Sequence, residues 1–450
     1  MKRFKLRVFS HPDINQNWNE VIKLQRKYQN LEVFMERNHE YVDKLIEVLD
    51  EIGPNLKSVT LFRVQFSDPN DFIEIFKRTP QLKELDLDEV SFDIREDTKN
   101  LQCKVSLSAL RKLKVKDCDW TVFDFVDSPY LNYLFLWQPK SNGHKLALFL
   151  NSLKKLSRLN CWYGTYQSVF DKPLVHQLKL NILGIYVREF ESDSEVLRKN
   201  LCNFLESQSS SLEVLTLYDR PPTKAFEIAL TKLSKLKTFR ADKLPDDISS
   251  FQMLKPLTSL KSLYIASGFA NSEIAKKLLG NCPNLVEFRS NHTNETFVKI
   301  LPFVADFNPK LESITVSNAF SEMAKVKFGC LKNLSVEVCD RQEIVRSFIE
   351  FVKFNPSIKK VKNRQPLSLE NLQFFVTEIM TQPNIKHLTI SAYGKDLKAV
   401  FDTIKSNYKN LKTLTMEFSD FQSTLLITFP EDVKRWNPES VIIRSNNKVD

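Results

Sequence analysis

The sequence predicts an α/β solenoid with a concave parallel β-sheet and convex helices. Three observations support this fold class. A short hydrophobic phrase recurs along the 450 residues, and the segments between its copies have helical periodicity. Glycine occurs only 8 times, against 34 phenylalanines, and no long Gly/Ser-rich or Pro-rich linker interrupts the chain. We therefore expect residues 1–450 to form a single array instead of several domains.

The recurring phrase is a leucine, two variable residues, an aliphatic residue, one variable residue and a second aliphatic residue. It reads LKELDL at Leu82, LRKLKV at Leu110 and LNYLFL at Leu131. Most copies begin 20 to 28 residues after the previous one, which is within the ~20–29 residues of a leucine-rich repeat. One longer spacing, 37 residues from Val175 to Leu212, indicates an insertion. The other copies begin at Leu56, Leu156, Leu236, Leu260, Leu285, Leu311, Leu331, Ile358, Ile385 and Leu411.

The ends of the array are expected to differ from its middle. Weaker copies of the phrase begin at Leu31 and near Val441, which brings the expected number of repeats to about 17. Terminal repeats of a solenoid must cover its exposed hydrophobic end. We therefore expect residues 1–30 to form an N-terminal capping repeat and residues 430–450 a C-terminal capping segment.

The segments between the phrases are predicted to be helices. In SEIAKKLLGNCPNL, the helix is expected to begin at Ser272 and to stop before Pro283. Its residues Ile274, Leu278 and Leu279 share one face. A Pro or Asn just ahead of the next leucine ends each helix. The same plan recurs in NETFVKILPFVADFNPKL, EIVRSFIEFVKFNPSI, LENLQFFVTEIMTQPNI and DLKAVFDTIKSNYKNL.

One strand and one helix cannot bury their own apolar faces, so neighbouring repeats must stack. The expected fold is a leucine-rich-repeat horseshoe, with the parallel sheet on the concave side and the helices on the convex side. Because side chains alternate along a strand, positions one, four and six of each phrase fill the core. Positions three, five and seven face the hollow.

Two repeats carry cysteine at the ninth position, Cys118 and Cys339, where this repeat class takes Asn or Cys. Helix-bearing, cysteine-tolerant repeats of this length resemble the leucine-rich repeats of F-box proteins, and the Phe-rich, irregular style is similar to the insect members of that family. The resemblance covers essentially the whole chain. It implies the substrate-recognition part of a ubiquitin ligase subunit, with a target protein held on the concave face.

An F-box itself is not evident in the chain. F-box segments usually open near a Leu-Pro pair, and the pairs at Leu244 and Leu301 both lie within the repeats. The Skp adaptor and the cullin are therefore expected as partners only if an F-box lies outside this sequence. A leucine-rich-repeat scaffold without a link to ubiquitin is the alternative function.

Four successive strands are predicted to place distinctive residues on the concave face. Neighbouring parallel strands lie ~4.8 Å apart, so an acidic row can neutralise the lysine row beside it, and Lys114 or Lys116 can lie over Trp137. The rows are Glu84, Asp86 and Asp88; Lys112, Lys114 and Lys116; Tyr133, Phe135 and Trp137; and Arg158, Asn160 and Trp162.

The aromatic side chains are the main candidate binding site. Each large aromatic can bury ~150–250 Å², so together they approach the largest apolar patches that monomers expose. In one interpretation a loop covers them, either QPKSNGHK after Trp137 or YGTYQS after Trp162. In the other they anchor a bound protein segment. Arg158, Tyr163 and Lys116 then form the polar rim.

A second group of hollow-facing residues lies further along the chain: Tyr218, Arg240, Tyr264 and Arg289. Spaced basic and aromatic side chains can engage an acidic or extended peptide, although ordinary solvated surface is the competing interpretation. A third candidate function, binding of RNA or another polyanion, would use the three lysines together with Arg240 and Arg289. The net charge of +10 is spread along the chain and does not favour nucleic acid.

The sequence offers no catalytic constellation. The six histidines have no carboxylate or cysteine at a ligand or triad spacing, and no GxSxG or Gly-rich phosphate loop occurs. The seven cysteines lie far apart and are expected to be reduced core residues. We therefore expect no enzyme activity, cofactor or metal. The absence of a signal peptide or apolar span favours a cytoplasmic or nuclear protein that is not bound to a membrane.

Overall fold

The computed structural model describes part of the chain, and the statements below refer to that part. The described residues are 4–9, 28–34, 42–93, 104–119, 121–137, 143–162, 177–187, 195–219, 223–242, 256–266, 272–290, 295–317, 321–393, 403, 411–418, 423–428 and 441–445. The chain divides into two compact units, Met1–Lys235 and Leu236–Asp450. Both units contain the predicted repeat, and each is described by itself. The expectation of one continuous array stays a prediction.

The first unit is built on parallel strands that follow one another in sequence order. These strands are β1 (Phe4–Phe9), β2 (Tyr28–Phe34), β3 (Ser58–Phe62), β5 (Glu84–Asp88), β8 (Lys112–Lys116), β10 (Tyr133–Trp137), β11 (Arg158–Trp162), β12 (Ile182–Val187) and β13 (Val214–Asp219). Two short parallel pairs flank them: β4 (Gln65–Phe66) with β6 (Ser91–Phe92), and β7 (Val105–Ser106) with β9 (Val126–Asp127).

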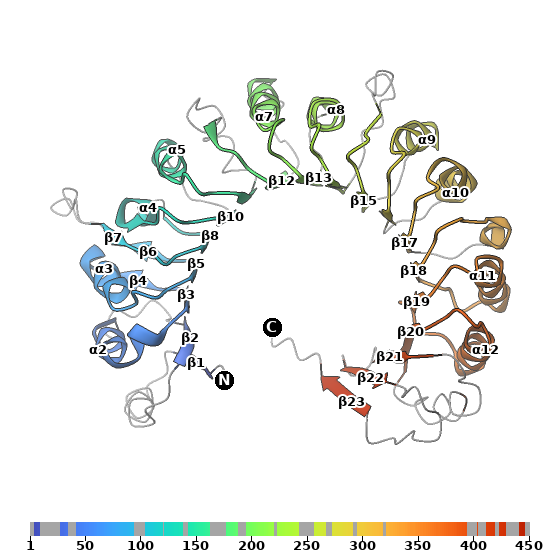
Figure 1. The fold of residues 1–450 in the computed structure, drawn as a ribbon. Coiled ribbons are helices and arrows are strands. Elements are labelled where there is room, and N and C mark those ends of the chain that lie inside the picture. Colours follow the sequence, from blue (N-terminus) through green and yellow to red (C-terminus); the bar gives the residue numbers. More distant parts are fainter. Residues whose placement is uncertain are drawn as a thin grey trace. The chain divides into compact units, whose positions relative to one another are not determined.

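Helices cover the other side of this sheet, as Figure 1 shows in blue to green. They are α2 (Val42–Ile52), α3 (Pro69–Lys77), α4 (Val122–Phe125), α5 (Gly143–Ser152), α7 (Glu195–Ser207) and α8 (Thr223–Thr231). The core lies between the two layers, and it contains positions one, four and six of the repeat. In the repeat that contains β10, for example, Leu131, Leu134 and Leu136 are at most 2% exposed. The predicted inward and outward faces are therefore confirmed.

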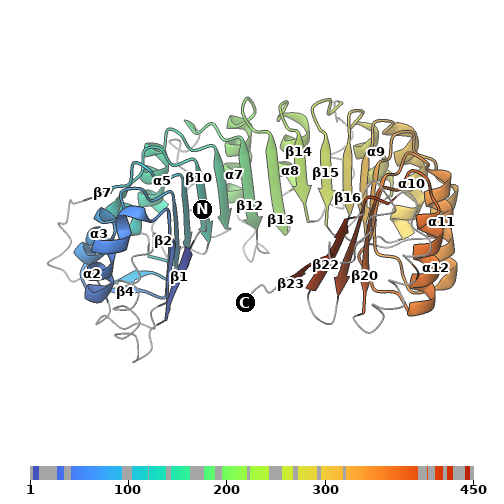
Figure 2. The same ribbon diagram turned by 60° about the horizontal axis from the view of Figure 1, so that its bottom comes forward.

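The second unit repeats this plan and ends differently. Its parallel strands are β14 (Thr238–Ala241), β15 (Ser262–Ile265), β16 (Glu287–Ser290), β17 (Ser313–Val316), β18 (Asn333–Val336), β19 (Lys360–Asn363), β20 (His387–Ala392) and β21 (Thr413–Phe418). The last two strands, β22 (Ser423–Thr428) and β23 (Val441–Ser445), pair antiparallel with the sheet (Figure 2). β23 runs in the same direction as the rungs, because the chain reverses at β22 and again at β23, but it joins them through the antiparallel β22. The weak repeat near Val441 stays a prediction.

Helices of the second unit match the sequence prediction closely. They are α9 (Ser272–Gly280), α10 (Glu295–Phe307), α11 (Gln342–Phe354) and α12 (Leu369–Met380). The fifth predicted helix, DLKAVFDTIKSNYKNL, lies almost entirely outside the described residues. After α11, the buried Asn355 accepts a hydrogen bond from the Phe328 amide at 2.6 Å and donates to the carbonyl oxygens of Val326 and Phe351 at 2.9 and 2.8 Å. It therefore satisfies three backbone groups where the helix turns back toward the next strand.

Two repeat starts were predicted in the wrong register. Leu31 pairs with Val59, which holds position four, so Tyr28 and not Leu31 begins that repeat. Leu183 pairs with Leu159, so the phrase on β12 begins at Leu180 and not at Val175. Overlapping apolar phrases fit the same local pattern in both places, and only the pairing with the neighbouring strand distinguishes them. With Leu180 as the start, the apparent 37-residue insertion becomes a 32-residue repeat.

Candidate functional site

The acidic row and the lysine row of the first unit neutralise each other, as the sequence predicted. Strands β5 and β8 pair in register, so that each lysine lies opposite a carboxylate. Lys112 lies 3.1 Å from Glu84, Lys116 lies 2.9 Å from Asp88, and Lys114 forms a hydrogen-bonded ion pair with Asp86. Most of the charge of these lysines is therefore already matched within the protein.

In the pair between Asp88 and Lys116, the pKa values of both partners are shifted. Burial raises the pKa of Asp88 although Lys116 opposes the shift, and the hydrogen bond to Asp88 raises the pKa of Lys116. One carboxylate oxygen of Asp88 is buried without a hydrogen-bond partner in the described part of the chain. The pair is therefore held against the sheet and offers a partner little net charge.

Aromatic rings from four adjacent strands form one cluster, which we call the aromatic cluster: Phe135 and Trp137 on β10, Trp162 on β11, Tyr186 on β12 and Tyr218 on β13. Ring centroids of Trp137 and Trp162 are 3.8 Å apart, and those of Tyr186 and Tyr218 are 4.0 Å apart and nearly parallel. All five side chains are half-buried. The rings cover one another in part, and this explains how so many large aromatics can share one face of the sheet.

Tyr186 is the centre of the aromatic cluster and was not identified from the sequence. Its ring centroid lies 5.8 Å from those of Trp137 and Trp162 and 6.5 Å from that of Phe135. The register error on β12 hid this residue, because a phrase starting at Val175 does not reach it. Counting from Leu180 places Tyr186 at position seven, the position of both tryptophans.

The polar side of the aromatic cluster surrounds Tyr133. The Asn160 side chain donates a hydrogen bond to the Tyr133 hydroxyl at 3.2 Å. The guanidinium carbon of Arg158 lies 5.6 Å from the ring centroid of Tyr133, and the Lys112 ammonium lies 5.8 Å from it. The cations therefore lie over Tyr133 and not, as predicted for Lys114 or Lys116, over Trp137. Arg158 has no carboxylate partner among the described residues.

A glycine on β12 brings these polar groups close to the strand. A Cβ atom at Gly184 would lie 2.4 Å from the side-chain oxygen of Asn160. Only glycine therefore leaves Asn160 room to lie flat across β12 beside the aromatic cluster. The segments predicted as covering loops, QPKSNGHK up to residue 142 and YGTYQS with Tyr163, lie outside the described residues.

The second predicted group is divided between the two units. Tyr218 belongs to the aromatic cluster of the first unit. Position five of the repeats that contain β14, β15 and β16 is held by Arg240, Tyr264 and Arg289, which lie side by side. Arg240 and Arg289 are exposed, and Arg289 forms an ion pair with Glu287 on its own strand at 2.5 Å.

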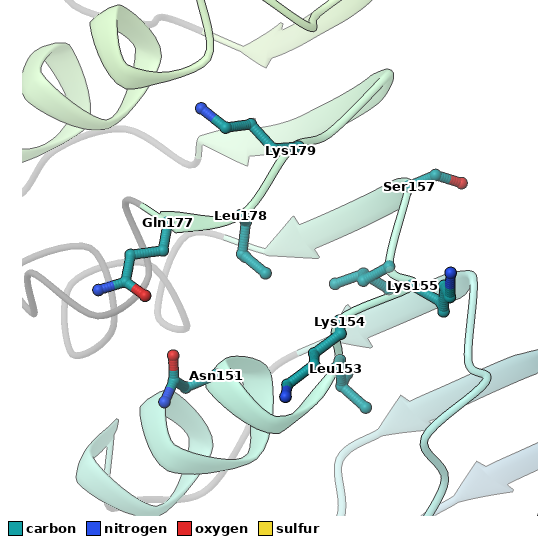
Figure 3. A pocket seen from close by; sticks show the side chains of 9 residues that line it. Asn151, Leu153, Lys154, Lys155, Ser157, Gln177, Leu178 and Lys179 are labelled. Carbon is teal, nitrogen blue, oxygen red and sulfur yellow. The ribbon is translucent and has the colours of Figure 1, made fainter.

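Described residues line a hollow in each unit. The first, of about 540 Å³, lies in the first unit at the end of α5 and the starts of β11 and β12 (Figure 3). Its lysines, Lys154, Lys155 and Lys179, point in different directions and do not converge on one point. The second, of about 450 Å³, lies on the concave face of the second unit and is lined by residues of β16 to β19.

The cysteines are structural wherever they are buried. Cys118, Cys161, Cys202 and Cys282 are buried thiols that are not in disulfides, Cys330 is exposed, and Cys103 lies outside the described residues. Burial raises the pKa of the first two and of Cys282 to about 12, so these thiols stay protonated. In the described part of the chain, no group of His, Cys, Asp or Glu is arranged to hold a metal ion. None of the helices described is long and apolar enough to cross a membrane.

The fold defines the class of protein: both units have the leucine-rich-repeat fold, with a parallel sheet on one side and helices on the other. No protein-family model matches the chain, and no curated protein matches it in sequence. A crystal structure of the yeast Rad7 and Elc1 complex matches 89% of this chain and 81% of that chain, with 12% identity and a TM-score of 0.30. A crystal structure of a TLR13–ssRNA13 complex matches 87% of this chain and 57% of that chain, with 14% identity and a TM-score of 0.46.

Proposed function

We propose that this chain is a protein-recognition module that holds an extended segment of a target protein against the aromatic cluster. The single observation that carries the proposal is the continuity of the cluster across β10 to β13. Large, rigid rings concentrated in one patch are typical of the residues that dominate protein–protein binding energy. The neighbouring acidic and lysine rows are mutually neutralised, so binding is expected to depend on apolar anchors.

Charge near the cluster gives the target segment a further chemical feature. Arg158 occupies position three of the repeat that contains β11, four residues before Trp162. An extended chain rises ~3.3 Å per residue, so the two side chains are separated by roughly 13 Å along the strand. Because Arg158 lacks a carboxylate partner among the described residues, a segment with an aromatic or aliphatic anchor and an acidic residue about four positions away fits both groups.

The finer function that we propose is substrate recognition in an F-box/leucine-rich-repeat ubiquitin ligase, in the cytoplasm or nucleus. The resemblance of the repeats to those of F-box proteins supports it. In that case a Skp adaptor and a cullin join through an F-box on another part of the protein. A leucine-rich-repeat scaffold without ubiquitin is the second candidate, and the same aromatic cluster would serve it.

Selection of peptides from a random displayed library by the purified chain tests the recognition role. We expect selected peptides to carry an apolar anchor and an acidic residue, and to lose at least tenfold in affinity when Trp162→Ala is introduced, since hot-spot truncations cost ~2 kcal/mol or more. Tyr130→Ala is the matched control, because Tyr130 is 51% exposed, precedes β10 in the same unit and lies outside the cluster. Equal loss in both variants, or selected peptides indifferent to Trp162→Ala, would exclude the aromatic cluster as the binding surface.

The ubiquitin link is tested separately. Purification of the complete protein from its native cells should recover a Skp adaptor and a cullin at near-equal amounts. If the protein carries target peptides but recovers neither subunit, the scaffold alternative replaces the ligase function. Binding that weakens steeply with added salt and does not depend on the aromatic cluster would favour the polyanion-binding candidate instead.

A further inference from the structure

The concave hollow of the second unit is lined by basic and neutral polar groups. Four cationic side chains contribute to it, and none of its lining residues is a carboxylate. The remaining polar lining comes from hydroxyl and amide side chains on β17 and β18. The cations are Arg289, Lys360, Lys362 and Arg364, and the neutral groups are Ser313, Thr315, Asn333 and Ser335.

Arg364 lies across the hollow instead of extending into solvent. It follows the end of β19, and its Nη2 donates a hydrogen bond to the carbonyl oxygen of Val316 at the end of β17, at 3.0 Å. The side chain therefore crosses β18, the strand between them. Its Nε is buried and has no hydrogen-bond partner in the described part of the chain. A buried guanidinium nitrogen without a partner is unusual, and a bound water or anion is one of the few explanations for it.

The carboxylates near this hollow lie at its margins. Lys362 contacts Glu417 on β21 at 2.7 Å, and Arg364 lies 3.4 Å from Glu337. These contacts use only part of the donor capacity of each cation, since an ammonium has three N–H groups and a guanidinium has five. Lys360, on β19, is exposed and has no carboxylate partner among the described residues.

A row of lysines adds to the positive potential at the edge of the hollow. These lysines hold position two of the repeats that contain β18 to β21. The backbone N–H of each later lysine donates to the carbonyl oxygen of the lysine before it, with N···O distances of 2.8, 2.8 and 2.7 Å. Like charges on adjacent strands repel one another unless a negative group lies nearby. Lys332 forms an ion pair with Glu312 of the neighbouring repeat at 2.6 Å. The row consists of Lys332, Lys359, Lys386 and Lys412.

We propose that this hollow binds a phosphate monoester, as the free anion or carried on a larger molecule. The double negative charge of a phosphate monoester matches the lysine and arginine side chains of the hollow. Its three oxygens can accept hydrogen bonds from the hydroxyl and amide side chains that line the same hollow. A monocarboxylate would leave several of these donors unused. The volume of about 450 Å³ leaves room for the atoms that carry the phosphate.

A long polyanion fits the hollow less well than a single phosphate group does. Glu287, Glu337 and Glu417 interrupt the positive surface on three of the strands. A nucleic acid that crossed the sheet would pass all three carboxylates, whereas a single phosphate beside Lys360, which has no carboxylate partner among the described residues, would not need to.

Calorimetric titration of the complete chain tests the proposal with three probes: inorganic phosphate, O-phosphoserine, and a neutral peptide that contains one phosphoserine. We expect Lys360→Gln and Arg364→Gln each to weaken binding at least tenfold, because each removes a charge-assisted hydrogen bond. Lys276→Gln is the control: it also removes one positive charge from the second unit, but Lys276 lies on α9 and pairs with Glu273 at 3.0 Å. Its affinity should stay within twofold of the unmodified protein.

Comparison of the probes identifies the source of the phosphate. Tighter binding of the phosphopeptide than of O-phosphoserine indicates a protein ligand, and equal binding of all three indicates a small phosphorylated molecule. The proposal is overturned if no probe binds, or if the control loses as much affinity as Lys360→Gln. It is also overturned if binding rises steadily with oligonucleotide length while the monoesters bind no better than sulfate. Lys360→Gln keeps the test decisive should Arg364→Gln unfold the unit, since the Lys360 side chain is exposed.

Discussion

Replacement of Tyr186 by alanine should remove the centre of the aromatic cluster. Its ring contacts four other rings, at centroid distances between 4.0 and 6.5 Å. A fully buried aromatic side chain removes ~150–250 Å² from contact with water. Tyr186 is half-buried, so its replacement by alanine loses about 120 Å² of buried surface. This loss corresponds to about 3 kcal/mol at ~25 cal/mol per Å². For a unit of this size, a loss of 1 kcal/mol lowers the Tm by ~2–4 °C. We therefore expect a Tm lower by about 6–12 °C.

Tyr186→Phe is the matched control. It keeps the ring and its four contacts, and it removes only the hydroxyl, so the expected loss is about 1 kcal/mol. Denaturant unfolding, followed by tryptophan fluorescence, measures both variants, because Trp137 and Trp162 lie next to Tyr186. A closely packed pair of indoles should also give a far-ultraviolet exciton signal, which Tyr186→Ala is expected to weaken and Tyr186→Phe to preserve.

Two results would refute this reasoning. If Tyr186→Ala costs less than about 1 kcal/mol, the rings do not support one another. If the phenylalanine and alanine variants lose equal stability, the hydroxyl and not the ring matters. Phe135 and Trp137 also contact neighbouring rings, so we expect their joint replacement by alanine to cause a measurable loss of stability together with loss of binding.

Three further predictions concern stability, pH and thiol reactivity. Asn355→Ala should destabilise the fold by about 2 kcal/mol or more, measured by urea unfolding, because it leaves the buried Phe328 amide and Val326 carbonyl oxygen without their partner; a loss below about 1 kcal/mol would contradict this. Burial, Lys360 and Lys412 lower the pKa of His387 below its ordinary value of 6.5. The folded protein therefore binds this proton less readily than the unfolded chain does, and its stability should fall as the pH drops below 6.5. NMR titration of the Lys360→Gln variant should show the pKa of His387 closer to its ordinary value. A maleimide should label the exposed Cys330 in the folded protein, and Cys118 only after unfolding; early labelling of Cys118 would show that its site opens.

The sequence alone determined the repeat, the strands and the direction of most side chains. A phrase such as LNYLFL alternates apolar residues with period two, so Leu134 and Leu136 had to be buried and Phe135 had to face the hollow. The same alternation on adjacent repeats places Asp86 opposite Lys114. These features follow from local spacing, which is present in the chain itself.

Tertiary structure decided what local spacing cannot encode. Two overlapping phrases before β12 were equally good locally, and only the hydrogen-bonded pairing of Leu183 with Leu159 selected the register that brings Tyr186 into the aromatic cluster. Long side chains that cross strands were equally hidden, because Arg364 reaches Val316 at a separation of 48 residues. A contact of that kind depends on the stacking of three rungs, and the free energy that fixes it comes from the packed core beneath them.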